Sequence, residues 1–146
     1  KKLDLIIIGY GTKLKKLYDF IKLNKIIKNV KILTNIKNPE YFLMKSKLFV
    51  LTSKYEGFGN VLIEAANNKI PIISSDCKHG PKEILGHGKF GELFPLGNSD
   101  ILAKKIYNFS VDDRKLVKKS KKLFKTLHRF STNKIIKKYN NIFIKI

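Results

Sequence analysis

Short apolar runs, each followed by a turn and then a helical segment, constrain the fold of this chain more than any other feature of its sequence. Runs rich in isoleucine, leucine and valine without polar interruption are typical of strands buried on both faces of a parallel sheet. The segments between them have apolar residues at helical spacing. This alternation predicts an α/β fold with a three-layer, Rossmann-like parallel sheet. The predicted strands are residues 3–8, 30–33, 48–52, 71–74 and 91–94.

Helix boundaries are indicated by capping residues and by proline. Thr12 is the expected N-cap of the first helix, whose buried side comprises Leu14, Leu17, Tyr18 and Ile21. Asn98-Ser99-Asp100 is expected to cap a later helix. Right-handed crossovers place the loops that follow parallel strands along one edge of the sheet. The predicted helices are residues 13–23, 39–46, 60–67, 81–85, 101–109, 112–128 and 131–144.

The length and composition predict a single domain, residues 1–146, at a cytoplasmic location. No run of about 18 apolar residues could span a membrane. The apolar part of the N-terminal segment, residues 5–8, is shorter than the roughly 7–15 residues of a signal peptide's core. The one cysteine, Cys77, cannot form an internal disulfide, and we expect it to be a small buried side chain.

The net charge of +20 suggests an anionic partner, but its composition argues against nucleic acid. Of the 31 basic residues, all but Arg114 and Arg129 are lysine, whereas nucleic-acid readers favour arginine for bidentate contacts. Many of the lysines accompany isoleucine and asparagine, which is typical of an AT-rich genome. We expect the remaining charge to favour an anionic membrane surface. A basic membrane- or nucleic-acid-binding module on a Rossmann-like scaffold remains the alternative hypothesis.

Gly9-Tyr10-Gly11 follows the first predicted strand and allows a ligand to approach the backbone at a helix N-terminus, where anions are favoured. The dinucleotide-binding fingerprint requires a third glycine where Leu14 stands, and no acidic residue follows the second strand. A nicotinamide-dependent enzyme is therefore disfavoured. A simple tight turn is the other interpretation of this segment.

The loop Glu56-Gly57-Phe58-Gly59-Asn60 lies between a predicted buried strand and a helix. Its amides from Phe58 to Asn60 are expected to face outward at the helix start, where a phosphate or a sugar oxygen would bind. Glu56, with Glu64 further along the helix, can accept hydrogen bonds from the two hydroxyls of a diol. The alternative interpretation is that Glu56 only interacts favourably with the helix dipole and that Glu64 is a solvated surface side chain.

Residues 74–85 follow the next strand and should lie beside the Glu56 loop. Lys78 and Lys82 are candidates for contact with a diphosphate, although exposed lysines are common. His79 and His87 could transfer protons, although loop histidines usually do not. No cluster of cysteine, histidine and aspartate has the spacing of a metal site.

The segment Glu-Gly-Phe-Gly-x4-Glu-Ala, with seven residues between Glu56 and Glu64, resembles the signature of the retaining GT-B glycosyltransferases of family 4. Similar features run along most of the chain. They are Gly9-Tyr10-Gly11, Asn38-Pro39, Pro71 to Cys77 with Gly80 to Leu85, Gly91 to Pro95, and Phe130-Ser131 with Tyr139.

The resemblance implies that this chain is the C-terminal, donor-binding half of a GT-B enzyme. It implies a role for Glu56 at the donor sugar and reaction centre, for Glu64 at the ribose, and for the turn at Asn35 to Asn38 at the nucleobase. Gly57, Phe58, Gly59 and Asn60 would contact sugar and diphosphate. Gly9 and Gly11 are also expected to bind the donor. The resemblance implies neither a cofactor nor a metal.

The resemblance also implies an N-terminal acceptor domain, together with an Arg and Lys pair that grips the donor phosphates, upstream of Lys1. The expected acceptor is a cell-surface glycan or lipid-linked molecule, and this half should transfer little by itself. Two positions depart from the family pattern, since glycine is usual at Thr34 and at Lys69. We expect Asn67-Asn68 to adopt the left-handed conformation in place of the second glycine.

Overall fold

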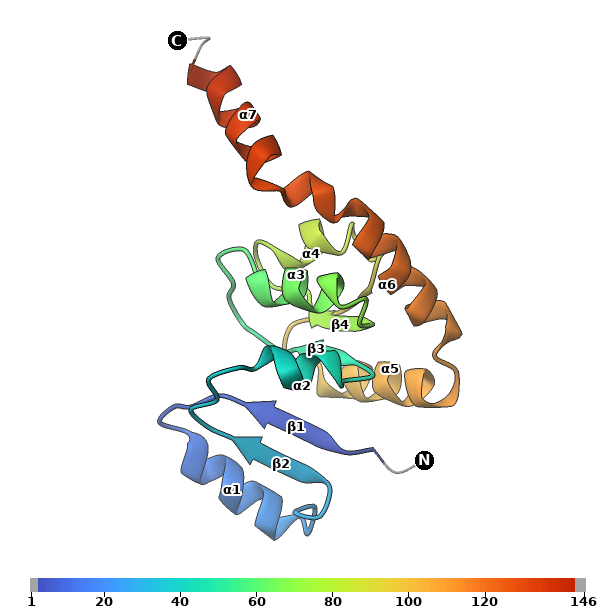
Figure 1. The fold of residues 1–146 in the computed structure, drawn as a ribbon. Helices are drawn as coiled ribbons and strands as arrows, with labels where there is room; N and C mark the ends of the chain where they lie inside the picture. The colour runs from blue at the N-terminus through green and yellow to red at the C-terminus, as the bar shows by residue number, and fades with distance from the viewer. Residues whose placement is uncertain (1–2, 144–146) are drawn as a thin grey trace. The chain divides into compact units, whose positions relative to one another are not determined.

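The computed structural model describes residues 3–143, apart from the side chain of Lys138, and it comprises two compact units, Lys1–Phe42 and Leu43–Ile146. The first unit contains β1 (Leu5–Ile8), α1 (Leu14–Leu23) and β2 (Val30–Leu33). Its strands are parallel, with Leu5 opposite Val30 and Ile8 opposite Leu33. Figure 1 shows α1 beside this two-stranded sheet. The unit is a βαβ motif, as the sequence predicts.

Three predictions for the first unit are wrong. The side chains of β1 are not buried, because a two-stranded sheet with one helix beside it has too little cover for both faces; Leu5 is 50% exposed and Ile6 44%. Tyr18 is exposed as well, whereas Ile21 is buried. Thr12 does not cap α1, because the N-cap position falls at Lys13, whose side chain makes no capping bond. The Leu14 N–H instead donates to the Gly11 carbonyl at 3.1 Å.

The second unit is built on a parallel sheet in the order β3-β4-β5. Its strands are β3 (Phe49–Leu51), β4 (Ile72–Ser75) and β5 (Glu92–Phe94), and α2 (Glu40–Met44) precedes β3 across the boundary of the units. The remaining elements are α3 (Asn60–Asn67), α4 (Pro81–Ile84), α5 (Ser99–Val111), α6 (Arg114–Thr126), the 3₁₀ helix η1 (Leu127–Phe130) and α7 (Thr132–Phe143).

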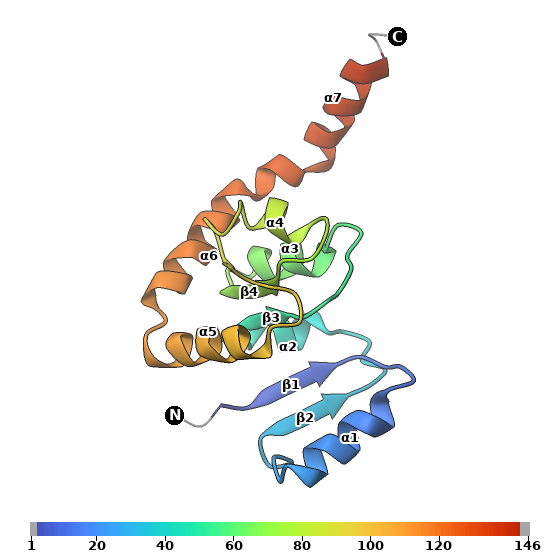
Figure 2. The ribbon, with the colours of Figure 1, turned by 180° about the vertical axis from the view of Figure 1, so that it is seen from behind.

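Alternate side chains of β4 enter two different cores, one on each face of this sheet. Ile72 is fully buried with Leu62 of α3 and Leu123 of α6. Ile73, next along the strand, is buried with Phe94 and Leu116, against α5. Helices therefore cover both faces, as Figures 1 and 2 show, and the predicted three-layer α/β architecture is confirmed in this unit. The described strands form two separate hydrogen-bonded ladders, β1-β2 and β3-β4-β5.

Most predicted elements agree with the structure within two residues, and α3 and β2 agree at both ends. The predicted helix at residues 112–128 begins at Arg114 and ends at Thr126, where the chain tightens into η1. The last residue of the helix predicted at 131–144 lies outside the described residues. Within residues 3–143, no helix combines the length and apolar character that crossing a membrane requires.

The C-terminus of α3 corrects the expectation for Asn67-Asn68. Lys69 itself adopts the left-handed conformation, with φ +57°. Its N–H donates to the Ala66 carbonyl at 2.9 Å, and the Ile70 N–H donates to the Ala65 carbonyl at 3.0 Å. This pair of bonds is a Schellman motif, which requires the left-handed residue one position after the C-cap Asn68.

Candidate functional site

The loops after β3 and β4 lie side by side at the carboxyl edge of the second sheet. The Ser75 hydroxyl donates to the Ser53 carbonyl at 2.7 Å, and Tyr55 and Lys78 form a parallel β-bridge. The adjacency that the sequence predicts for these loops is thereby confirmed. Ligands of open parallel α/β sheets bind at this edge.

Gly80, in the second loop, packs against the Phe58 carbonyl of the first loop so closely that a residue with a side chain would not fit there. Its backbone has φ +79°, and a Cβ placed there would lie 1.9 Å from the Phe58 carbonyl oxygen and 2.6 Å from the carbonyl carbon. Heavy atoms cannot approach so closely. The Phe58 peptide is therefore held against the second loop by a contact that requires glycine.

The start of α3 has no side-chain cap. Gly59 occupies the N-cap position in a left-handed conformation, with φ +91°. The first turn also contains no acidic residue. Helix starts leave backbone N–H groups without intrahelical partners, and the helix dipole makes them attractive to anions. The backbone at Gly59 and Asn60 can therefore hold a phosphate or another anionic group.

Glu64 lies on the face of α3 opposite the core. Leu62, Ala65 and Ala66 are fully buried, whereas Asn60 and Glu64 are exposed. Residues four apart share one helix face, and side chains lean toward the N-terminus of their helix. Glu64 is therefore oriented toward the start of α3, and Glu56, partly buried, precedes that start in the loop.

Phe58 is supported from the C-terminal part of the chain. Its ring meets the Phe130 ring edge to face, with centroids 5.4 Å apart. The Arg129 guanidinium lies 4.4 Å from the centroid of the Phe130 ring and donates to the Glu83 and Ile84 carbonyls of α4. Burial lowers the pKa of Arg129, against the opposing effect of Glu83. Sequence reasoning missed the role of Arg129, although an arginine among so many lysines was a usable signal.

The other charged candidates in and after the second loop are exposed side chains. Lys82 forms an ion pair with Asp76 at 3.0 Å, and its side chain is half exposed. His79 and His87 are exposed and adopt left-handed conformations, with φ +63° and +55°. Cys77 is buried, as expected. In the part of the chain that the structure describes, no group of three or more potential ligands is arranged to hold a metal ion.

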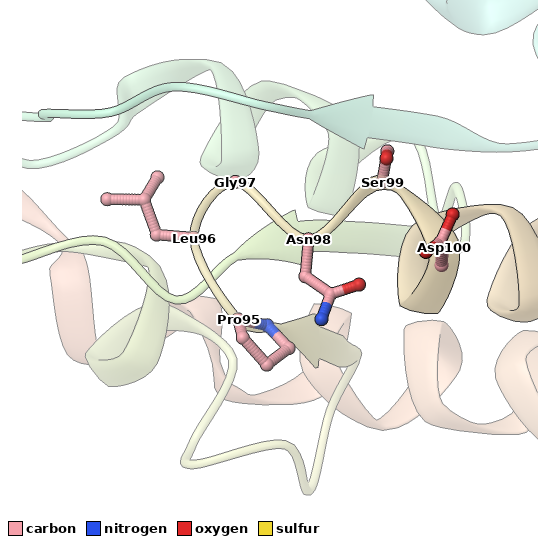
Figure 3. Close-up of a pocket in the computed structure, with 6 residues that line it drawn as sticks. All are labelled: Pro95, Leu96, Gly97, Asn98, Ser99 and Asp100. Atoms are coloured by element: carbon pink, nitrogen blue, oxygen red, sulfur yellow. The ribbon is translucent and has the colours of Figure 1, made fainter.

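A shallow pocket follows β5 at the same edge, and no motif in the sequence indicated it. It has a volume of about 410 Å³ and is lined by residues Pro95 to Asp100 (Figure 3). The Asn98 side chain accepts a hydrogen bond from the Ile101 N–H at 2.9 Å and so caps α5, as predicted. Gly97, with φ +78°, makes the turn that opens the pocket.

The remaining predicted site residues belong to the first unit. Gly9 and Gly11 line a largely apolar pocket of about 360 Å³ between the sheet and α1, with Ile7, Leu14 and Leu17 among its other walls. Asn35 is exposed and left-handed, with φ +53°. The predicted residues Glu56 to Asn60 and Glu64 all belong to the second unit.

Comparison with known proteins identifies the family. The sequence pattern described as "Glycosyl transferases group 1" matches residues 1–137. The chain belongs to this family. The Campylobacter jejuni N-acetylgalactosamine-N,N'-diacetylbacillosaminyl-diphospho-undecaprenol 4-alpha-N-acetylgalactosaminyltransferase is 32% identical over 77% of this chain and 31% of its own length. The Staphylococcus aureus poly(ribitol-phosphate) alpha-N-acetylglucosaminyltransferase is 31% identical over 94% of this chain and 28% of its own length.

Solved structures agree with this family assignment. The crystal structure of TarM superposes with a TM-score of 0.86 at 30% identity, over 96% of this chain and 28% of that one. Anabaena Alr3699/HepE in complex with UDP superposes with a TM-score of 0.87 at 22% identity, over 99% of this chain and 41% of that one. The predicted GT-B glycosyltransferase fold is confirmed. The chain spans less than half the length of each of these relatives.

Proposed function

We propose that this chain binds the nucleotide-sugar donor of a retaining glycosyltransferase. The enzyme would transfer a hexose or N-acetylhexosamine to a cell-surface glycan or a lipid-linked acceptor. The observation that carries the proposal is the Glu56–Asn60 loop, held by Gly80 at the carboxyl edge of a parallel sheet, before an uncapped helix bearing an exposed Glu64. Such an edge, with free amides and two carboxylates, suits a ligand that has both phosphates and hydroxyls.

Each part of the loop has a role in this proposal. The amides at the start of α3 bind the diphosphate, whose negative charge the helix dipole stabilises. Glu64 accepts hydrogen bonds from the two ribose hydroxyls. Glu56 binds hydroxyls of the donor sugar beside the reaction centre. Positive side chains and helix dipoles stabilise the leaving diphosphate without a metal ion.

The relatives support a nucleotide-sugar donor and a glycan acceptor. A crystal structure of a mutant S. aureus TarM, 30% identical to this chain, contains UDP and alpha-GlcNAc-glycerol. The C. jejuni relative is named for a diphospho-undecaprenol acceptor and the S. aureus relative for poly(ribitol-phosphate). We propose that the acceptor binds to a separate N-terminal domain, so that this chain alone transfers little sugar.

Calorimetric titration of the chain with UDP-, GDP- and ADP-linked hexoses and N-acetylhexosamines tests the proposal. We expect one nucleotide class to bind, with affinity unchanged by a metal chelator. Glu64→Ala should weaken binding at least about tenfold, because hydrogen bonds to a charged acceptor contribute roughly 1.5–3 kcal/mol each. Asp19→Ala, which removes an exposed carboxylate from α1, is the matched control and should leave the affinity unchanged.

Three outcomes would each contradict a part of this proposal. The donor-binding proposal fails if no nucleotide sugar binds to the chain or to a longer protein that contains it. If Glu64→Ala binds as tightly as the unaltered chain, the ribose assignment is wrong. The retaining assignment is tested separately on the longer protein, by determining the anomeric configuration of the product by NMR. An inverted product would overturn it.

A further inference from the structure

The outer face of α6 is a continuous strip of positive charge. Six basic side chains on this helix are exposed, while Leu116, Ser120 and Leu123 on the opposite side are buried. At about 100° and 1.5 Å per residue, the six fall within about 120° of arc and extend over about 17 Å. We call them the α6 basic stripe: Arg114, Lys115, Lys118, Lys121, Lys122 and Lys125.

Most of this charge is available to a partner. Arg114 is held by Asp112, to which its Nε and Nη2 donate at 2.9 Å each. Lys119 lies outside the stripe and forms an ion pair with Glu92 at 2.6 Å. Among the residues that the structure describes, no acidic side chain forms an ion pair with any of the five stripe lysines.

The disposition of both arginines favours a lipid surface over nucleic acid as the partner. Nucleic-acid recognition relies on the planar guanidinium fork, which matches phosphates and guanine bidentately. In this chain Arg114 is engaged by Asp112, and Arg129 points inward to the Glu83 and Ile84 carbonyls. What remains is a straight row of lysines, and lysine ammonium groups near an anionic membrane surface each contribute favourable binding energy.

We propose that the α6 basic stripe docks on an anionic phospholipid membrane. The helix leads directly toward the candidate site, because η1 follows it and Phe130 at the end of η1 contacts Phe58. This proposal concerns the surface of α6 and does not depend on donor binding.

Co-sedimentation of the full chain with vesicles tests the proposal. The vesicles are phosphatidylcholine alone or phosphatidylcholine with phosphatidylglycerol at a mole ratio of about 7:3. We expect binding to the anionic vesicles, weakening as salt is added. A quadruple variant of the stripe should bind these vesicles at least about tenfold more weakly, since each surface lysine contributes about fivefold to the binding constant. Its substitutions are Lys115→Gln, Lys118→Gln, Lys122→Gln and Lys125→Gln.

A second quadruple variant distinguishes the effect of the α6 basic stripe on vesicle binding from the effect of overall charge. It removes the same charge from exposed positions in the first unit, by the substitutions Lys15→Gln, Lys16→Gln, Lys22→Gln and Lys28→Gln. We expect this variant to bind the anionic vesicles within about threefold of the unaltered chain. Circular dichroism and thermal melting of both variants must match the unaltered chain, and with all eight substitutions at exposed positions we expect them to do so.

The possible results are decisive in either direction. Selective loss of vesicle binding in the α6 variant supports the proposal. Equal loss in both variants would show that net charge alone attracts the chain to the membrane, and the proposal would be wrong. Absence of binding to anionic vesicles would overturn it directly. It would also be overturned if mixed-sequence double-stranded DNA, and not the vesicles, distinguished the two variants.

Discussion

At the scale of single residues, Gly80 is the position on which the candidate site depends most. Substitution by alanine would place a methyl group 1.9 Å from the Phe58 carbonyl oxygen, and the backbone at φ +79° already disfavours an L side chain. The loops after β3 and β4 must then separate. We expect Gly80→Ala to lower the free energy of unfolding by about 3 kcal/mol or more, as measured by urea denaturation.

Gly88 provides the control for Gly80, because it separates backbone strain from steric clash. Its φ is +87°, yet a Cβ there would meet no heavy atom within 4 Å. Gly88→Ala should therefore cost only the strain of the left-handed conformation, about 1–2 kcal/mol. Similar losses for the two variants would show that the contact with Phe58 contributes nothing.

Residue identities indicated the position of the Glu56–Asn60 loop and the Asn98 cap, but they did not indicate the contacts that support this loop. The Glu56–Asn60 loop and Asn98 could be recognised because glycine and capping residues act locally, within a few positions of the chain. The position of Lys69 was missed, since a left-handed lysine is stabilised by the hydrogen bonds of the Schellman motif and not by its own preference. Arg129 was missed because its partners, Glu83 and Ile84, are more than 40 residues away.

At the scale of elements, Glu92 connects β5 to α5 and α6. Its carboxylate accepts from Lys105 at 2.7 Å and from Lys119 at 2.6 Å, and all three side chains are mostly buried. Burial alone would raise the pKa of Glu92, but the two lysines outweigh it and hold the pKa below its ordinary value of 4.5. The ionised carboxylate therefore stabilises the fold above about pH 4.5, and this contribution is lost as the pH falls through the lowered value.

We expect Glu92→Gln to reduce the free energy of unfolding at pH 7 by about 1–3 kcal/mol, because two partly buried lysines lose their charged acceptor. The difference from the unaltered chain should shrink as the pH falls below 4.5, the ordinary value from which the pKa of Glu92 is lowered. Denaturation followed across that pH range measures both effects. Asp112→Asn is the control, since its pair with Arg114 is exposed and should contribute little.

The positions of the helices and strands were largely predictable from the sequence, but the burial of their side chains was not. Periodicity located α3 and β2 at both ends because the apolar spacing there is unambiguous. The apolar run at β1 also predicted a strand, but it could not indicate what would cover that strand, and Leu5 and Ile6 are exposed. Likewise, the sequence could not divide its strands between two ladders, since pairing depends on contacts between residues far apart in the chain.

At the scale of the whole molecule, the two units differ in how completely each buries its own apolar residues. Every member of both described core clusters lies in the second unit. In the first unit, among the described residues, Ile21 is the one buried hydrophobic side chain. A two-stranded sheet with one helix is marginally stable in water, and chains of about 40 residues seldom fold without further support.

The second unit should therefore fold without the first. We expect residues 39–146, which keep α2 whole, to unfold cooperatively and to retain helical circular dichroism, because both faces of the β3-β4-β5 sheet remain covered. Residues 1–38 by themselves should give the spectrum of an unfolded chain. Amide NMR spectra of residues 39–146 should show the dispersed resonances of a folded domain. A non-cooperative melt of residues 39–146 would show instead that the cores of the second unit require the first unit to form.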